Sequence, residues 1–258
     1  MRALLMTAKK KGWWQPWANT LLYFPLENNA IDIVNNVSLT SSWTTNYTTV
    51  WGVQSAEFTK SNWLSNNNVS VIPQWDVAKT LSVRLYTKWS NQGWQGIAQM
   101  WSVWAWNVFW LWNYKLTTNI VMTRYWSTSN TYTPTLNTWT HIVVTYNNSI
   151  WKMYANWNLV VTWNTTAPTS WYNLYIGQNV GDIDTIVTYY WNISRFILEL
   201  GEWTAQEVLD YYNATKDNYP QNRNSNNVEE NYIKIEPTED IHITPNKNDN
   251  WSGDLQKF

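Results

Sequence analysis

The chain is short of cysteine, glycine and charge. Its 258 residues include no cysteine, which excludes a disulfide framework and cysteine metal sites. Charged residues make up 14% of the chain, and the formal net charge is −1. Without a basic surface, the protein has nothing that would attract nucleic acid or an anionic membrane, and we expect neither as a partner.

Long apolar runs are also missing. Residues 1–6 begin like a signal peptide, but the apolar run ends at Thr7 and three lysines follow at positions 9–11. That run is too short for the apolar region of a secretory signal. No run reaches the roughly 18 apolar residues that a membrane-spanning helix needs. We therefore expect no signal peptide and no membrane span.

The shortage of glycine is matched by an excess of tryptophan. The chain has 8 glycines and 23 tryptophans, whereas average usage of about 7% would give roughly 18 glycines. Residues 101–112 alone contain five tryptophans, and few cores could pack such volume without strain. Many of the tryptophans lie at or beside expected turns, where glycine would supply a positive φ.

We interpret this pattern as genetic recoding, in which UGA encodes glycine but has been translated as tryptophan. Exchanging sixteen tryptophans would raise the glycine count from 8 to 24, which is normal for an all-β protein. The alternative is a genuinely tryptophan-rich surface, which would be adhesive and could bind carbohydrate. The sixteen are Trp43, Trp51, Trp63, Trp75, Trp89, Trp101, Trp104, Trp106, Trp110, Trp112, Trp126, Trp151, Trp157, Trp163, Trp171 and Trp191.

The clearest structural signal is residues 137–164, NTWTHIVVTYNNSIWKMYANWNLVVTWN. Trp139 to Tyr146 is rich in β-branched and aromatic residues, which favour a strand, and residues 147–149 favour a turn. A second strand over residues 152–155 and a third over 159–162 are separated by Asn156, Trp157 and Asn158. The sequence predicts consecutive hairpins, with a tryptophan where a tight turn favours glycine.

The pattern W-x-H-I-V-V-T-Y followed by K-x-Y-x-N-x-N-L-V resembles the laminin G-like branch of the concanavalin A-like lectin/glucanase superfamily. Glycine is usual there at the position of Trp157. The resemblance spans residues 19–216 and is most specific in YYWNISRFILEL and TAQEVLDYYNATK, with Ser194 at the family's usual aspartate. It implies an all-β jelly-roll β-sandwich of two antiparallel sheets with one short C-terminal helix.

The rest of the pattern agrees with one such domain. Alternation predicts that residues 79–88 form a strand with one core face, carried by Leu81, Val83 and Leu85. Thr204 and Glu207 form a capping box that starts a helix from residue 205 to about residue 214. We divide the chain into a flexible basic arm (1–18), the domain (19–216) and a flexible tail or linker (217–258). Further strands are expected over residues 21–26, 55–58, 69–72, 96–100, 107–116, 119–125, 173–177 and 189–200.

Candidates for catalysis are few. Retaining glycoside hydrolases need two carboxyl groups about 5–5.5 Å apart, and the spacing used by the glucanase branch is absent. Glu199 and Glu202 lie three residues apart, and we interpret them as solvated charges at a strand end. His141 falls in a predicted strand, where the resemblance implies packing or hydrogen bonding. We expect the protein not to be an enzyme, with a glycoside hydrolase as the less favoured alternative.

A calcium ion is the one cofactor that the resemblance allows. Some family members hold calcium at the rim of the loops through hard oxygen ligands. None of the candidates here lies in an acidic cluster, so ordinary turns and caps are the favoured interpretation. The candidate ligands are Asp32, Asp76, Asp182 and Asp184.

Recognition remains the best prediction for function. Glycan sites combine aromatic platforms with polar groups on loops. We expect a non-catalytic carbohydrate-binding or adhesion module of an extracellular, cell-surface or virion protein, whose partner is a glycan or a surface protein and which joins other modules of a larger assembly. A structural decoration domain of a virion is the alternative. The candidate ligand-binding residues are Trp94, Tyr125, Tyr132, Tyr172, Asp182 and Asp184.

Overall fold

The computed structural model describes a domain that lies within the first of two compact units, residues 1–222 and 223–258. No helix among the described residues is long and apolar enough to cross a membrane. The described residues are 18–42, 44–58, 62–72, 77–88, 95–102, 105–113, 119–124, 127–166, 173–177 and 191–219.

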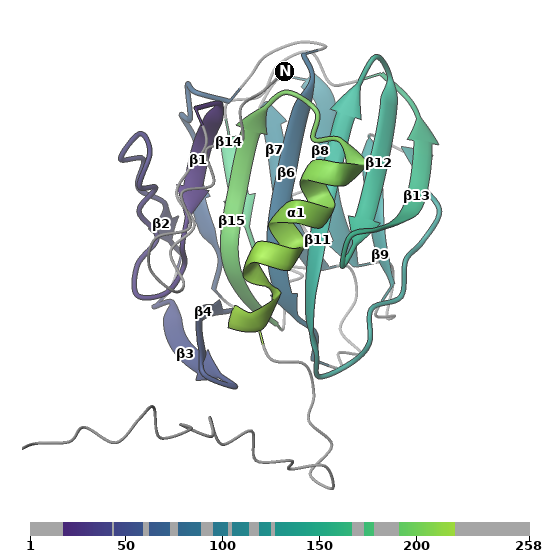
Figure 1. Cartoon of the computed structure of the whole chain (residues 1–258). Coiled ribbons are helices and arrows are strands. Elements are labelled where there is room, and N and C mark those ends of the chain that lie inside the picture. Colours follow the sequence, from purple (N-terminus) through teal and green to yellow (C-terminus); the bar gives the residue numbers. More distant parts are fainter. Residues whose placement is uncertain are drawn as a thin grey trace, which may run out of the picture. The chain divides into compact units, whose positions relative to one another are not determined.

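The domain is built from two antiparallel sheets (Figure 1). The eight-stranded sheet has the order β13-β12-β11-β6-β15-β4-β3, and β1 pairs with β15 outside this path. This arrangement confirms the predicted β-sandwich. Its strands are β1 (Thr20–Phe24), β3 (Asn46–Val50), β4 (Val53–Glu57), β6 (Lys79–Tyr86), β11 (Trp139–Asn147), β12 (Ile150–Ala155), β13 (Asn158–Asn164) and β15 (Asn192–Leu200).

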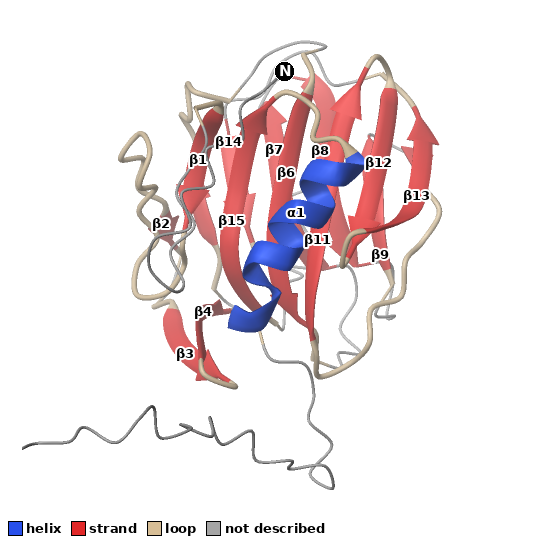
Figure 2. Cartoon of the chain, viewed as in Figure 1, coloured by secondary structure: helices blue, strands red, loops and turns tan. Residues whose placement is uncertain are grey.

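The seven-stranded sheet has the order β10-β9-β8-β7-β14-β5-β2. Figure 2 shows it behind the eight-stranded sheet, so that the two form the layers of the sandwich. Its strands are β2 (Thr40–Ser41), β5 (Leu64–Asn66), β7 (Gln95–Ser102), β8 (Ala105–Asn113), β9 (Ile120–Arg124), β10 (Ser127–Thr128) and β14 (Asn173–Ile176).

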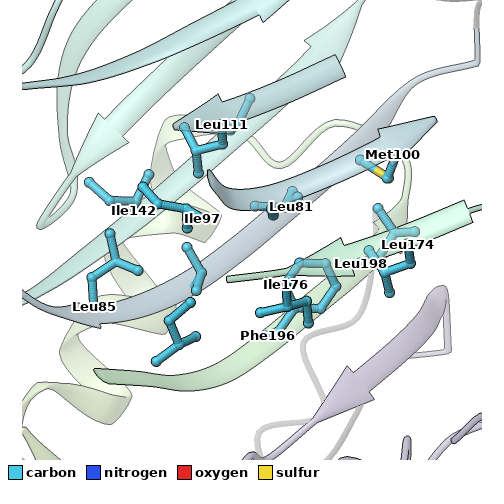
Figure 3. Close-up of a cluster of buried hydrophobic side chains, with 14 of the residues drawn as sticks. Leu81, Leu85, Ile97, Met100, Leu111, Ile142, Leu174, Ile176, Phe196 and Leu198 are labelled. Atoms are coloured by element: carbon cyan, nitrogen blue, oxygen red, sulfur yellow. The ribbon is translucent and has the colours of Figure 1, made fainter. Parts of the chain in front are cut away.

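The hydrophobic core fills the space between the sheets. Alternate residues of each strand point inward, as strand geometry requires. Figure 3 shows side chains from both layers meeting there, with Leu81 and Phe196 from one sheet facing Ile97 and Ile176 from the other. All four are fully or almost fully buried.

The predicted hairpins are confirmed. Strands β11, β12 and β13 pair consecutively in antiparallel register. Asn148 and Ser149 adopt positive φ in the first turn, and Asn156 (47°) and Trp157 (75°) do so in the second. The second turn thus has the pair of left-handed residues that a two-residue hairpin favours, with tryptophan in one of the two positions.

The predicted helix is confirmed as α1 (Ala205–Thr215), with the capping box of Thr204 and Glu207 in place. It crosses the outer face of the eight-stranded sheet (Figure 1). Its Val208 and Tyr211 are buried there against Trp203 and residues of the sheet. A 3₁₀ turn, η1 (Lys216–Asn218), continues the chain, and Tyr219 is buried. The packed structure therefore extends past residue 216, while residues 1–17 and 220–258 lie outside the described part.

The prediction for β6 is confirmed for its core face, but the opposite face is not exposed. All eight residues of the strand are buried. Leu81, Val83 and Leu85 face the core as expected, but Ser82 and Arg84 are also buried, at 1% exposure each, and bond to His141 and Thr215. The cause is non-local, because α1 and the residues that follow it cover the outer face.

The predicted strand over residues 69–72 is also wrong. This segment forms a turn, in which the Ile72 amide donates to the Val69 carbonyl at 3.2 Å. Val69 and Ile72 are both buried. These two residues are apolar because they reach the core from a turn, so their spacing does not indicate a strand.

Four of the suspected tryptophans show two different environments. Trp51 (φ 52°) and Trp157 (φ 75°) occupy left-handed turn positions that disfavour bulky side chains. Trp151 and Trp191 instead have ordinary φ and are 2% and 0% exposed, and the Trp151 indole donates to the Thr165 carbonyl at 2.9 Å. The positive-φ argument therefore applies to the first group and not to the second.

Candidate functional site

The best candidate for a recognition site is the outer face of the seven-stranded sheet, opposite the core. Leu174 and Ile176 of β14 are core residues, so Tyr175 between them points to the outer face. Strand pairing puts Tyr175 in register with Ser65 of β5 and Gln99 of β7. Ser65 in turn pairs with Thr40 of β2. Residues from four strands thus form one row.

The row continues across the sheet toward β10. Gln99 pairs with residue 110 of β8, which pairs with Thr123 of β9 and then Thr128 of β10. Gln99 is fully buried and Thr123 is 2% exposed. The indole of Trp112 donates to Thr123 Oγ1 at 2.6 Å and is itself buried. The centre of the face is therefore a covered, hydrogen-bonded region that a ligand cannot reach directly.

The β14–β5–β2 end of the row is accessible. Tyr175 and Ser65 are half-buried, and Thr40 and Asn67 are exposed. The Tyr175 hydroxyl donates to Asn67 Oδ1 at 2.8 Å, and the Thr40 hydroxyl donates to the Ser65 carbonyl at 3.0 Å. Partial burial raises the pKa of Tyr175, so its hydroxyl stays protonated at neutral pH. We call these four residues the Tyr175 patch.

The chemistry of the Tyr175 patch suits a neutral, hydroxyl-rich ligand. A fixed aromatic ring offers an apolar surface, while its hydroxyl and the neighbouring amide and hydroxyls donate and accept hydrogen bonds. No carboxylate or ammonium group belongs to the patch, so it has no preference for a charged ligand. Its strand residues are held by the sheet, and the hydrogen bond from the Tyr175 hydroxyl to Asn67 restrains the ring.

The predicted ligand-binding residues do not form this patch. Tyr132 lies after β10 and is half-buried. It forms an isolated bridge with Ile120, the first residue of β9, and packs against the core. Burial raises its pKa. Sequence reasoning missed Tyr175 and Ser65, although the alternation in Asn173–Ile176 could have indicated that Tyr175 faces outward. The other five predicted residues, Trp94, Tyr125, Tyr172, Asp182 and Asp184, lie outside the described residues.

Asp32 is the only predicted calcium ligand within the described residues. Its carboxylate accepts backbone amides from Tyr23, Val34 and Asn35, and the side chain is fully buried. These bonds fix the loop after β1, so a cation would have to displace them. Asp76, Asp182 and Asp184 fall outside the described part, within which no three acidic or histidine side chains gather around a possible metal position.

The catalytic candidates are engaged in structural contacts. Glu199 is 1% exposed within β15, so its interpretation as a solvated charge is wrong. Glu202 is half-buried and pairs with Lys152 at 2.8 Å and with the Asn147 amide at 2.9 Å. Because Glu199 is enclosed by the sheet, these two side chains do not form an open pair of carboxyl groups.

His141 has the packing and hydrogen-bonding environment that the resemblance implies. It is fully buried, with Nε2 and the Ser82 hydroxyl 2.8 Å apart. The rings of Tyr211 and Tyr212 lie over it, at 5.1 and 6.4 Å between centroids. Burial, together with the charges of Arg84 and Arg195, lowers its pKa well below the usual value. The imidazole is therefore neutral and enclosed.

No protein-family model and no curated protein sequence matches this chain. Solved structures match its fold. Domain 4 of AbnA, an extracellular arabinanase from Geobacillus stearothermophilus solved with arabinotriose, has a TM-score of 0.59 at 12% identity, covering 74% of this chain and 97% of that domain.

Binding domains of botulinum neurotoxins match as well. A structure of botulinum neurotoxin type C has a TM-score of 0.59 at 13% identity, and cell entry of that toxin depends on interaction with two ganglioside molecules. The binding domain of serotype D/C VPI 5993 has a TM-score of 0.60 at 15% identity. Each match covers 76% of this chain but only about half of the toxin chain, 51% and 52%. Together the sheets, the helix and these likenesses show that the chain has a β-sandwich fold.

Proposed function

We propose that this domain is a non-catalytic carbohydrate-binding module that recognises a neutral glycan through the Tyr175 patch. The observation that carries the proposal is the half-buried Tyr175 ring, held by a rigid strand with Ser65, Thr40 and Asn67 beside it. A sugar ring stacks its C–H face on an aromatic side chain and bonds through its hydroxyls. The arabinotriose of one similar domain is a neutral glycan and supports this class of ligand. The ganglioside dependence of the type C toxin supports glycan recognition in general.

A glycan array probed with the full-length protein tests the proposal. The wild type is expected to retain a subset of neutral glycans, and Tyr175→Ala is expected to lose them. Tyr47→Ala is the matched control, because Tyr47 is also a half-buried tyrosine on a strand but belongs to the other sheet. No retained glycan, or equal loss in both variants, would refute the Tyr175 patch as the site.

The absence of catalysis is part of the same proposal. It is supported by the burial of Glu199 and by the ion pair between Glu202 and Lys152, because a hydrolase needs two accessible carboxyl groups. Incubation of each retained glycan with the protein should give no shorter products. Turnover that Glu202→Gln abolishes would replace the binding proposal with the hydrolase alternative.

We also propose that the module works outside the cell, on a cell surface or on a virion, and within a larger assembly. The likeness to a domain of an extracellular arabinanase and to toxin binding domains supports this setting. A protein partner is the alternative to a glycan, since one similar domain was solved with synaptotagmin. Immunogold labelling of intact cells and of purified particles distinguishes the settings, and labelling confined to the cell interior would contradict both.

The affiliation to the laminin G-like branch and the recoding of UGA as glycine remain parts of our proposal. The left-handed turn positions of Trp51 and Trp157 support recoding, whereas the buried Trp151 and Trp191 do not require it. Sequencing the gene tests it directly. UGA codons at residues 51 and 157 are expected, and UGG codons at both would refute the hypothesis.

A further inference from the structure

Two arginines are buried between α1 and the eight-stranded sheet. Arg84 of β6 is 1% exposed, and Arg195 of β15 is 8% exposed. Strand pairing brings them together, because Arg84 lies opposite Ser194, the residue before Arg195. Burial lowers the pKa of Arg84 to about 10, so it stays protonated at neutral pH. Two like charges are thus enclosed side by side.

No carboxylate neutralises this pair within the described part of the chain. The ion pairs found there, Lys88–Glu57 and Lys152–Glu202, involve neither arginine. Glu27 is near enough for its charge to act on Arg195, but the two do not form an ion pair. A buried charge without a counter-charge is costly. The described residues therefore supply no ion-pair partner for the two guanidinium groups.

The aromatic neighbours contact the planar faces of the guanidinium groups, but they do not accept hydrogen bonds from the N–H groups at the edges. The Tyr219 ring lies 4.6 Å from Arg84 and 5.3 Å from Arg195, which gives favourable cation–π contacts. Around the edges, Arg84 Nη2 donates to the Thr215 hydroxyl at 2.6 Å. By distance and angle, Nε and Nη1 of both arginines form no hydrogen bond in the described structure, and the Tyr211 hydroxyl lies near Arg195. These nitrogens are donors only, so their partner must be an acceptor.

The backbone at Arg195 adds an independent observation. Arg195 has a φ of 55°, in a β-bulge where the pairing between β15 and β6 shifts register. A left-handed arginine is strained, and such strain persists where the surroundings require a particular side-chain direction. Here the bulge brings a second buried guanidinium to Arg84. The sheet thus positions two cationic donors at one place.

We propose that Arg84 and Arg195 form a buried site for a small oxyanion of the phosphate or sulfate class, which holds α1 against the eight-stranded sheet. Oxyanions supply both the negative charge and several acceptor oxygens, and guanidinium groups bind them through charge-assisted hydrogen bonds. The hydroxyls of Ser194 and Tyr219, 3.1 Å apart, lie in the same cluster. This site is separate from the Tyr175 patch, which belongs to the other sheet.

Thermal unfolding of the full-length protein tests the proposal with inorganic phosphate as the probe. The protein is first dialysed into an oxyanion-free chloride buffer, and phosphate is then added at constant pH and ionic strength. Tm is expected to rise saturably, by about 5–10 °C when phosphate reaches a hundred times its dissociation constant. No saturable rise in the wild type would overturn the proposal.

Two variants separate a specific site from the general stabilising effect of phosphate. Arg195→Gln and Arg84→Met are each expected to lose the phosphate-dependent rise, and both remove a buried charge instead of creating one. Lys88→Gln is the control, because Lys88 pairs with Glu57 away from the cluster, and it should keep the full rise. A rise of the same size in all four proteins would show general exclusion of phosphate only, and would refute the site.

Discussion

The substitution Trp157→Gly is expected to stabilise the protein as its sequence is written here. Trp157 has a φ of 75° and is 44% exposed. A left-handed conformation costs a residue with a side chain about 1–2 kcal/mol. Glycine removes this cost but adds about 0.5–1 kcal/mol of backbone entropy to the unfolded state. The indole is exposed, but more than half of its surface is still covered. Loss of this contact reduces the gain, so the net gain is at most about 0.5–1 kcal/mol.

Trp151→Gly is the matched comparison, since it deletes the same atoms six residues earlier. Trp151 is 2% exposed, packs on Tyr146 at 4.4 Å between ring centroids and donates a hydrogen bond to Thr165. Truncation of such a buried tryptophan costs about 3–5 kcal/mol, and a glycine within a strand adds about 0.5–1 kcal/mol. The two variants therefore differ in the sign of their effect.

Urea denaturation followed by circular dichroism measures both free energies of unfolding. The reasoning predicts a higher midpoint for Trp157→Gly than for the wild type, and a much lower one for Trp151→Gly. A loss of more than about 1 kcal/mol in Trp157→Gly, measured at unchanged urea dependence, would show that its indole stabilises the turn. The strain argument, and the part of the recoding hypothesis that rests on it, would then fail.

Three further predictions concern the helix, the buried histidine and a tight contact. Thr204→Ala removes half of the capping box and should cost about 1 kcal/mol in thermal or urea unfolding; no loss would show that the cap contributes nothing. Burial, reinforced by the neighbouring arginine charges, keeps the pKa of His141 well below its unfolded value. The unfolded chain thus binds an extra proton below about pH 6.5, so stability should fall between pH 6.5 and 5, and His141→Gln should flatten this dependence. Gly177→Ala should lower Tm, because φ is 86° and an added Cβ would collide with the Phe58 ring; an unchanged Tm would contradict that contact.

The sequence predicted best where the determinants are local. The capping box lies within four residues, and alternation with turn residues sufficed for β11, β12 and β13. A hairpin needs only neighbouring strands to satisfy its backbone. The pattern in residues 79–88 likewise predicted the strand and its core face.

What the sequence could not supply was the covering of one element by another distant in the chain. Arg84 looked like a solvent-facing residue because its burial depends on Thr215 and Tyr219, more than 130 residues away. Glu199 was misread for a related reason. It lies near the end of β15 as expected, but it is buried because β1 and β6 pair with the strand on both sides. The strand of Tyr175 was expected, but the pairing that brings Ser65 of β5 and Thr40 of β2 into its row joins segments distant in the chain.

The central claim of this account is glycan recognition by the Tyr175 patch, and isothermal titration tests it most directly. With the glycan retained best on the array, Tyr175→Ala should weaken binding at least about tenfold, or 1.4 kcal/mol. Tyr175→Phe should lose less, because it keeps the ring and removes only the hydroxyl that bonds to Asn67. Unchanged affinity in Tyr175→Ala, with Tyr47→Ala equally unaffected, would place recognition elsewhere and contradict the account.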